Sequence, residues 1–183
     1  MTTRTDYTED EWNRLLRGPI VAGLAISIAD PGGPIEATKE TLASVRVIGD
    51  PPEGEPLLAE ISAEVRDRSQ NRENPMGDFR LEGAAVAGAQ VLDELREIAG
   101  ILDAKASPTE AVAYRAWMME AANAAAEAAK EGGFLGIGGQ QVSEGEAAMI
   151  GRIREALGTT PMHEAGVDVV DQADVPPAGM DVG

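Results

Sequence analysis

Apolar residues recur every three or four positions along most of the chain, the spacing that places them on one face of an α-helix. Six stretches have this pattern, and Gly, Pro or polar residues separate them: 9–29, 34–47, 55–68, 81–104, 108–130 and 144–157. The clearest stripe belongs to the fourth stretch and consists of Leu81, Ala84, Gly88, Val91, Leu95, Ile98 and Leu102. The pattern therefore predicts an all-α fold, a bundle of about six helices.

Several helix starts are marked by Ser or Thr followed three positions later by Glu. In this capping box each side chain accepts a hydrogen bond from the other residue's backbone amide. The pairs are Thr8 with Glu11, Ser107 with Glu110, and Ser143 with Glu146. Inside the first stretch, Pro19 has no amide hydrogen to donate, so we expect a kink or a division of the helix there. Residues 69–78 have no helical period and are predicted to form an exposed loop.

The ordered body is expected to end near Leu157, which gives one helical domain over residues 1–158 and a tail over 159–183. The tail contains five acidic residues and no Lys or Arg, and this composition predicts a flexible acidic segment. Within the body, Ala29-Asp30-Pro31-Gly32-Gly33 is echoed by Ala129-Lys130-Glu131-Gly132-Gly133. The echo indicates either two pseudo-repeated helical hairpins or a coincidence in an alanine-rich chain.

Composition narrows the possible partners. The chain has 183 residues and a formal net charge of −17, and it shows no cluster of Lys and Arg that could bind nucleic acid or an anionic membrane surface. Its longest apolar run, residues 19–29, is about half of a bilayer span, so we expect no membrane insertion. The chain has no cysteine, and residues 1–11 lack the pattern of a signal peptide. A cytoplasmic protein is predicted.

A glycine-rich tract over residues 131–139 separates the last two predicted helices. It contains three large apolar residues, Phe134, Leu135 and Ile137, where a loop is ordinarily polar. The tract lacks the Gly-Lys-Ser/Thr ending of a phosphate-binding loop. Two interpretations remain: the three side chains fill the end of the bundle, or they bind a protein partner.

Carboxylates gather around the two Gly-Gly segments and are candidate ligands for a divalent cation, which prefers several converging oxygen atoms. The candidates are Asp30, Glu36, Glu131, Glu144 and Glu146. The alternative is that these residues cap helices and face solvent. The only histidine, His163, lies in the predicted tail, so no catalytic constellation is visible and an enzyme is not expected. Trp12 and Trp117 are predicted to anchor the core.

The stretch 124–157 resembles the C-terminal half of the TerB-like (tellurite-resistance B) helical domains. The resemblance is carried by Ala128-Ala129-Lys130-Glu131-Gly132-Gly133 and by Val142-Ser143-Glu144-Gly145-Glu146, followed by Ile153 and Leu157. The family turn usually reads Ala-Asp-Gly, whereas Lys130-Glu131-Gly132 stands here. The resemblance implies a helical interaction domain with acidic residues able to hold a metal ion, in a stress-response setting.

The sequence therefore predicts a non-enzymatic helical interaction or scaffold module with no required cofactor. It would bind a protein partner through the glycine-rich apolar loop or the acidic tail, or would self-associate through the small residues of 121–129. The alternative is a divalent-cation-binding regulatory domain that resembles TerB-like proteins.

Overall fold

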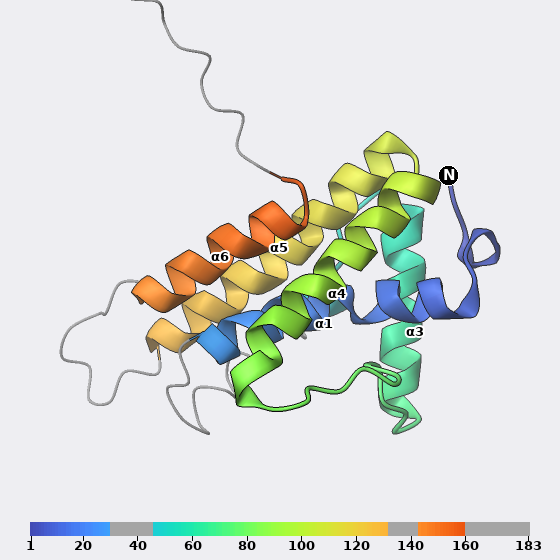
Figure 1. The fold of residues 1–183 in the computed structure, drawn as a ribbon. Helices are drawn as coiled ribbons and strands as arrows, with labels where there is room; N and C mark the ends of the chain where they lie inside the picture. Colours follow the sequence, from blue (N-terminus) through green and yellow to red (C-terminus); the bar gives the residue numbers. More distant parts are fainter. Residues whose placement is uncertain (30–45, 132–142, 160–183) are drawn as a thin grey trace, which may run out of the picture.

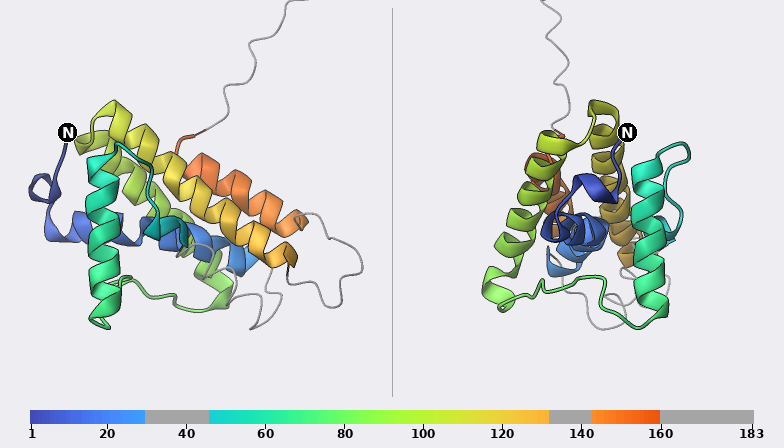
Figure 2. Two further views of the ribbon diagram at one scale, coloured as in Figure 1. Left: turned by 180° about the vertical axis from the view of Figure 1, so that it is seen from behind. Right: turned by 90° about the vertical axis from the view of Figure 1, so that its right-hand side faces the viewer.

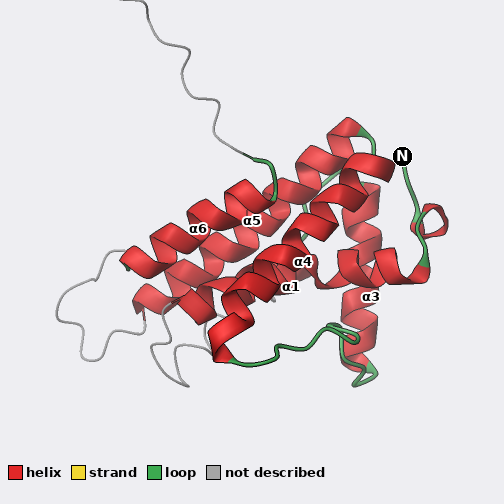
Figure 3. Ribbon diagram, in the orientation of Figure 1, coloured by secondary structure: helices red, strands yellow, loops and turns green. Residues whose placement is uncertain are grey.

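One long helix, α1 (Glu9–Ala29), lies at the centre of the protein. The computed structural model describes residues 1–29, 46–131 and 143–159, and for 129–131 only the backbone. Helices α3 (Pro56–Gln70), α4 (Ala84–Lys105), α5 (Pro108–Glu131) and α6 (Glu144–Ala156) all contact α1, and a short 3-10 helix, η1 (Arg4–Asp6), precedes it (Figure 1). Residues 46–49 are also helical. The described part of the chain contains no strand, which confirms the all-α prediction (Figure 3).

Helix α1 is buried on nearly every side, because α4 and α6 cover one part of it and α5 and α3 another (Figure 2). The apolar spacing of 9–29 predicts one inward face, and the buried surface of α1 is wider than that. Val21, Ala22, Ala25 and Ile26 are as fully buried as Trp12. Small residues make up about half of the second half of α1, so neighbouring helices can approach it closely there. Both tryptophans are completely buried, which confirms their predicted place in the core.

All three predicted capping boxes are present. Thr8, Ser107 and Ser143 each donate their backbone N–H to the glutamate three residues later, over 2.7–3.0 Å. Glu11 also accepts from Lys105 Nζ at 2.6 Å, and this hydrogen bond is the main reason why its pKa falls to about 2. The caps fix the starts of α1, α5 and α6 where the sequence places them.

One helix boundary and the exposure of one loop differ from the sequence prediction. Helix α4 begins at Ala84, three residues after Leu81. The reason is Gly83, whose φ of +134° is not helical and is rarely adopted by residues other than glycine. Leu81 is consequently exposed and does not belong to the apolar stripe. The loop between α3 and α4 is also less exposed than predicted, since Met76 and Phe79 pack against the core.

Pro19 lies inside α1 but does not divide it, contrary to one of the two outcomes expected from the sequence. In an unbroken helix the carbonyl of Leu15 would accept from the residue at position 19, and proline has no N–H to donate. The hydroxyl of Tyr114, on α5, donates to that carbonyl instead. The missing bond inside α1 is thus replaced by a bond between helices.

The predicted second helix, 34–47, lies mostly outside the described residues, as do the two Gly-Gly segments on which the repeat prediction rests. Where the chain is described again, Ile48 is buried and the Val47 carbonyl accepts from Trp117 Nε1 at 3.0 Å. Among the helices described, none is both long and apolar enough to cross a membrane.

Candidate functional site

A groove of about 640 Å³ lies between α4 and α6 at the C-terminal end of α1. Figure 1 shows how these three helices are arranged. Helix α4 contributes one side, α6 the other, and the last turn of α1 the end between them. The lining residues are Ile28, Ala29, Ala84, Ala85, Gly88, Ala89, Leu92, Arg96, Met149, Arg152 and Glu155. The groove therefore joins three helices that are far apart in the sequence.

The hollow exists because α4 has almost no side-chain volume on this side. Four small residues, spaced one or four positions apart, form a continuous stripe on α4 that has no atoms beyond Cβ. They are Ala84, Ala85, Gly88 and Ala89. A Cβ built at Gly88 would lie 3.9 Å from the Met149 methyl group, which is ordinary contact distance. A larger side chain at position 88 would therefore extend into the groove.

The rim of the groove is charged. Arg96 on α4 and Arg152 on α6 are both exposed, and Glu155 lies one turn beyond Arg152. Arg96 forms an ion pair with Asp93 on its own helix. Two guanidinium groups above an apolar floor are suited to a ligand with carboxylates and small apolar side chains, because guanidinium and carboxylate form directional, charge-assisted hydrogen bonds.

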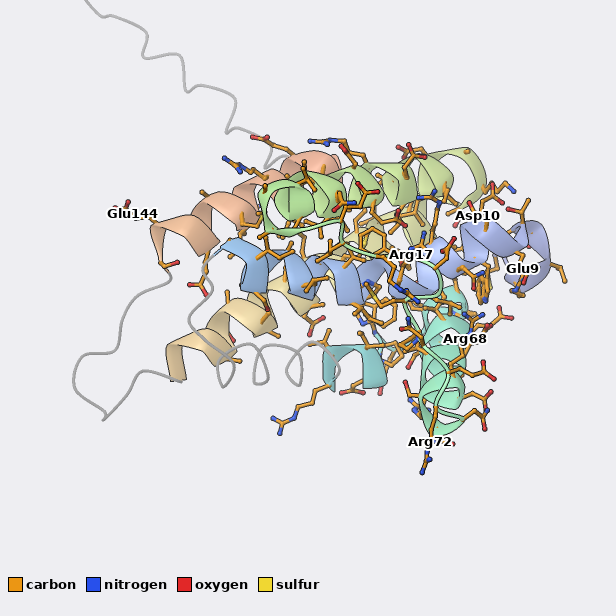
Figure 4. All side chains as sticks on the ribbon, turned by 60° about the horizontal axis from the view of Figure 1, so that its bottom comes forward. Glu9, Asp10, Arg17, Arg68, Arg72 and Glu144 are labelled. Atoms are coloured by element: carbon orange, nitrogen blue, oxygen red, sulfur yellow. The ribbon has the colours of Figure 1, made fainter. Side chains whose placement is uncertain are left out.

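A buried ion pair joins α1 to the middle of α4. Arg17 of α1 and Glu94 of α4 are only 3% and 7% exposed, and Arg17 Nε lies 2.7 Å from Glu94 Oε1. The second carboxylate oxygen of Glu94 lies 2.6 Å from Arg14 Nη1. Arg17 lies in the interior of the helical body (Figure 4).

The same arginine fixes the loop that leads into α4. Arg17 Nη1 lies 3.0 Å from an Asp78 carboxylate oxygen and donates to the Met76 carbonyl, and the guanidinium stacks over the Phe79 ring. The loop ends at Gly83, directly before the alanines of the groove floor. Arg17 therefore anchors the loop that leads to the groove floor.

Neither member of this pair is among the residues predicted to be functional. A signal was present in both cases, because Arg17 interrupts the apolar run 15–21 and Glu94 stands between Leu92 and Leu95. The groove gave a weaker signal. The apolar period places Gly88 on an inward stripe, and a stripe of small residues predicts close helix packing as readily as a surface hollow.

The residues predicted to bind a partner, Phe134, Leu135 and Ile137, lie outside the described part of the chain. So do Asp30 and Glu36, two of the predicted cation ligands, and for Glu131 only the backbone is described.

The remaining two predicted ligands, Glu144 and Glu146, lie in the first turn of α6. Glu146 is buried, and one of its carboxylate oxygens accepts the Ser143 N–H at 2.8 Å. Glu144 points outward (Figure 4). Among the side chains described, no group of three or more acidic, His or Cys residues could hold a metal ion.

Comparison of the chain with protein-family models, with curated proteins and with solved structures finds no match. The resemblance to TerB-like domains accordingly stays a prediction.

Proposed function

We propose that this protein is a non-enzymatic helical interaction module, and that the groove between α4 and α6 binds an acidic, partly apolar peptide segment of a protein partner. The observation that carries the proposal is the groove itself, an apolar floor of small residues below two exposed arginines. Grooves of this kind accept a peptide by burying its apolar side chains, while charges on the rim select its sequence.

The negative charge of the whole chain restricts where an acidic peptide can bind. The chain as a whole carries −17, so most of its surface repels an acidic peptide. Arg96, which is paired with Asp93, and Arg152 border the same hollow and outnumber the one acidic lining residue, Glu155. An acidic segment is therefore expected to bind in this groove rather than elsewhere, and long-range repulsion is expected to slow its association at low salt.

The buried charged groups have structural tasks. Arg17 and Glu94 pair with each other, and Glu110 and Glu146 close capping boxes. These groups are therefore assigned to the scaffold and not to ligand binding. The predicted apolar loop, with Phe134, Leu135 and Ile137, remains a second contact region of the proposed module.

Peptide display tests the proposal. Random peptides selected on the full chain are expected to be enriched in Asp or Glu next to small apolar residues. Gly88→Met should reduce their affinity at least about tenfold, a difference of about 1.4 kcal/mol, because the new side chain fills the groove.

Gly100→Met is the matched control, since Gly100 lies in the same helix and a Cβ there would meet no atom within 4 Å. Gly100→Met should leave the peptide affinity unchanged. It controls for the general effect of replacing a helical glycine. Peptides that bind the Gly88 variant as tightly as the native chain, or a selection that enriches basic peptides, would refute the proposal.

A divalent-cation-binding regulator is the second candidate function, and one contact favours it. A Cβ at Gly145 would lie 2.9 Å from the Ala29 carbonyl oxygen, so the turn that carries Glu144 packs directly against the residue before Asp30. Two of the predicted cation ligands are thus connected to backbone segments that touch. The proposal requires the carboxylates to converge on one ion.

Millimolar Ca²⁺ or Mg²⁺ is expected to raise the Tm by several degrees if the cation binds the folded state alone. Differential scanning calorimetry with and without a chelator measures the shift. Glu144→Gln should abolish it, whereas Glu60→Gln, an exposed change on α3, should not. An unchanged Tm would exclude the cation-dependent function.

A further inference from the structure

The groove lies on the helix from which the C-terminal segment leaves the body. Met149, Arg152 and Glu155 of α6 line it, and α6 ends at Ala156. At the end of the helix Gly158 has a φ of +66°, and the Thr159 N–H donates to the Arg154 carbonyl at 2.9 Å. This arrangement is a Schellman motif, which turns the chain away from the helix axis.

We infer that the segment 160–183 of this chain binds in the groove between α4 and α6 as an internal ligand that competes with the partner. The inference rests on the proposed function, because it requires the groove to accept acidic, partly apolar peptides. Three properties of the segment support this placement: its charge, its composition and its length.

The charge and composition of the segment match the groove. Residues 160–183 contain five acidic side chains and no Lys or Arg. The run Val167-Asp168-Val169-Val170 combines a carboxylate with small branched apolar groups. The valines are of a size that can pack on Ala85 and Gly88, while Asp168 and Asp171 supply carboxylates for Arg96 and Arg152.

The length of the segment allows this placement. Met149 precedes Thr159 by ten residues, so it lies about 15 Å back along α6 at a rise of about 1.5 Å per residue. An extended chain covers about 3.3 Å per residue, and residues 160–167 can therefore span about 26 Å. Val167 and the residues after it reach the whole groove without strain.

The covalent connection of the segment to α6 also raises its occupancy of the groove. A short covalent link holds the segment at an effective concentration on the order of millimolar, so even a weak intrinsic affinity is sufficient for substantial occupancy. An external ligand must displace the segment, and it binds more weakly in proportion to that occupancy. The segment would thus set the threshold at which a partner binds.

Disulfide trapping in the full chain tests the inference, and the absence of native cysteine makes the result unambiguous. Ala85→Cys in the groove is combined in turn with Val167→Cys, Val169→Cys or Val170→Cys. At least one pair is expected to form an intramolecular disulfide about tenfold faster than the same tail cysteine combined with Gly100→Cys, because docking concentrates the thiol at the groove.

Two conditions separate docking from random collision of the tail. The rate advantage should fall in about 1 M salt, where the Debye length is about 3 Å. It should also fall when Glu164 is changed to Gln and Asp168, Asp171, Asp174 and Asp181 are changed to Asn. The same five changes should tighten the binding of display-selected peptides to the groove.

Equal rates at positions 85 and 100 for all three tail cysteines would overturn the inference. If display-selected peptides nevertheless bind the native groove and not the Gly88→Met variant, only the internal ligand is refuted and the proposed function stands. Rapid trapping at position 85 together with peptides that ignore the groove in the neutralised-tail variant would instead refute the proposed function.

Discussion

Replacement of Glu94 by alanine is expected to lower the free energy of unfolding by about 3 kcal/mol, the lower end of the range for breaking a buried ion pair. The change leaves the Arg17 guanidinium, which is 3% exposed, without its closest partner. Asp78 remains beside Arg17, but its carboxylate is 87% exposed and compensates only in part. Denaturation with urea, followed by circular dichroism, measures the difference.

Asp93→Ala is the matched control, one residue earlier on the same helix. Asp93 forms an ion pair with Arg96 in which both side chains are more than half exposed, so its loss should change the stability by less than about 1 kcal/mol. A similar loss for both variants would contradict the structural importance of the Arg17–Glu94 pair.

A double variant separates the charge from the packing. In Arg17→Met with Glu94→Leu, both charges are removed together and apolar groups of similar length take their place. Most of the stability lost in Glu94→Ala should return, because the large cost comes from the unpaired charge. The loop at Asp78 should then loosen even though the body is stable, and hydrogen exchange at residues 76–79 would report it.

The features that could be predicted from the sequence depend on few and nearby residues. Each capping box is set by two side chains three positions apart, and all three were predicted correctly. The described helices likewise follow from local periodicity. The sequence predicts the start of α4 three residues too early, because Leu81 continues the apolar period. The backbone conformation of Gly83 prevents the helix from extending back to Leu81.

The features that could not be predicted depend on contacts between distant elements. Periodicity indicates one apolar face for α1, but four other helices surround it, so that even Arg17 is enclosed. A buried charge is recognisable only when its partner is known, and Glu94 is 77 positions away. The groove is even harder to predict from the sequence, because it is defined by volume that the side chains of α4 do not fill.

The bond between Tyr114 and α1 leads to the second large effect. Tyr114 is completely buried, and burial raises the pKa of its hydroxyl, which therefore stays protonated and donates to the Leu15 carbonyl. Tyr114→Phe leaves that carbonyl without a donor, since Pro19 cannot supply one. We expect a loss of about 1–3 kcal/mol, the cost of an unsatisfied buried acceptor.

Gly18 completes the arrangement, because the Tyr114 hydroxyl occupies the space where a Cβ would stand. Gly18→Ala is therefore expected to destabilise the protein by about 1–3 kcal/mol through overpacking, although alanine is the better helix former. The hydroxyl cannot move aside without giving up its bond to Leu15. Gly100→Ala, also inside a helix but with open space around it, should instead stabilise the protein by up to about 1 kcal/mol.

A double-mutant cycle decides whether the two residues act as one unit. In Gly18→Ala combined with Tyr114→Phe, the new methyl group takes the place of the missing hydroxyl, so the combined loss should be smaller than the sum of the two single losses by at least about 0.5 kcal/mol. Urea denaturation of the four proteins gives the coupling directly. Additive losses would mean that the clash at Gly18 is relieved by a movement of α5, and that Tyr114 does not hold α1 together at Pro19.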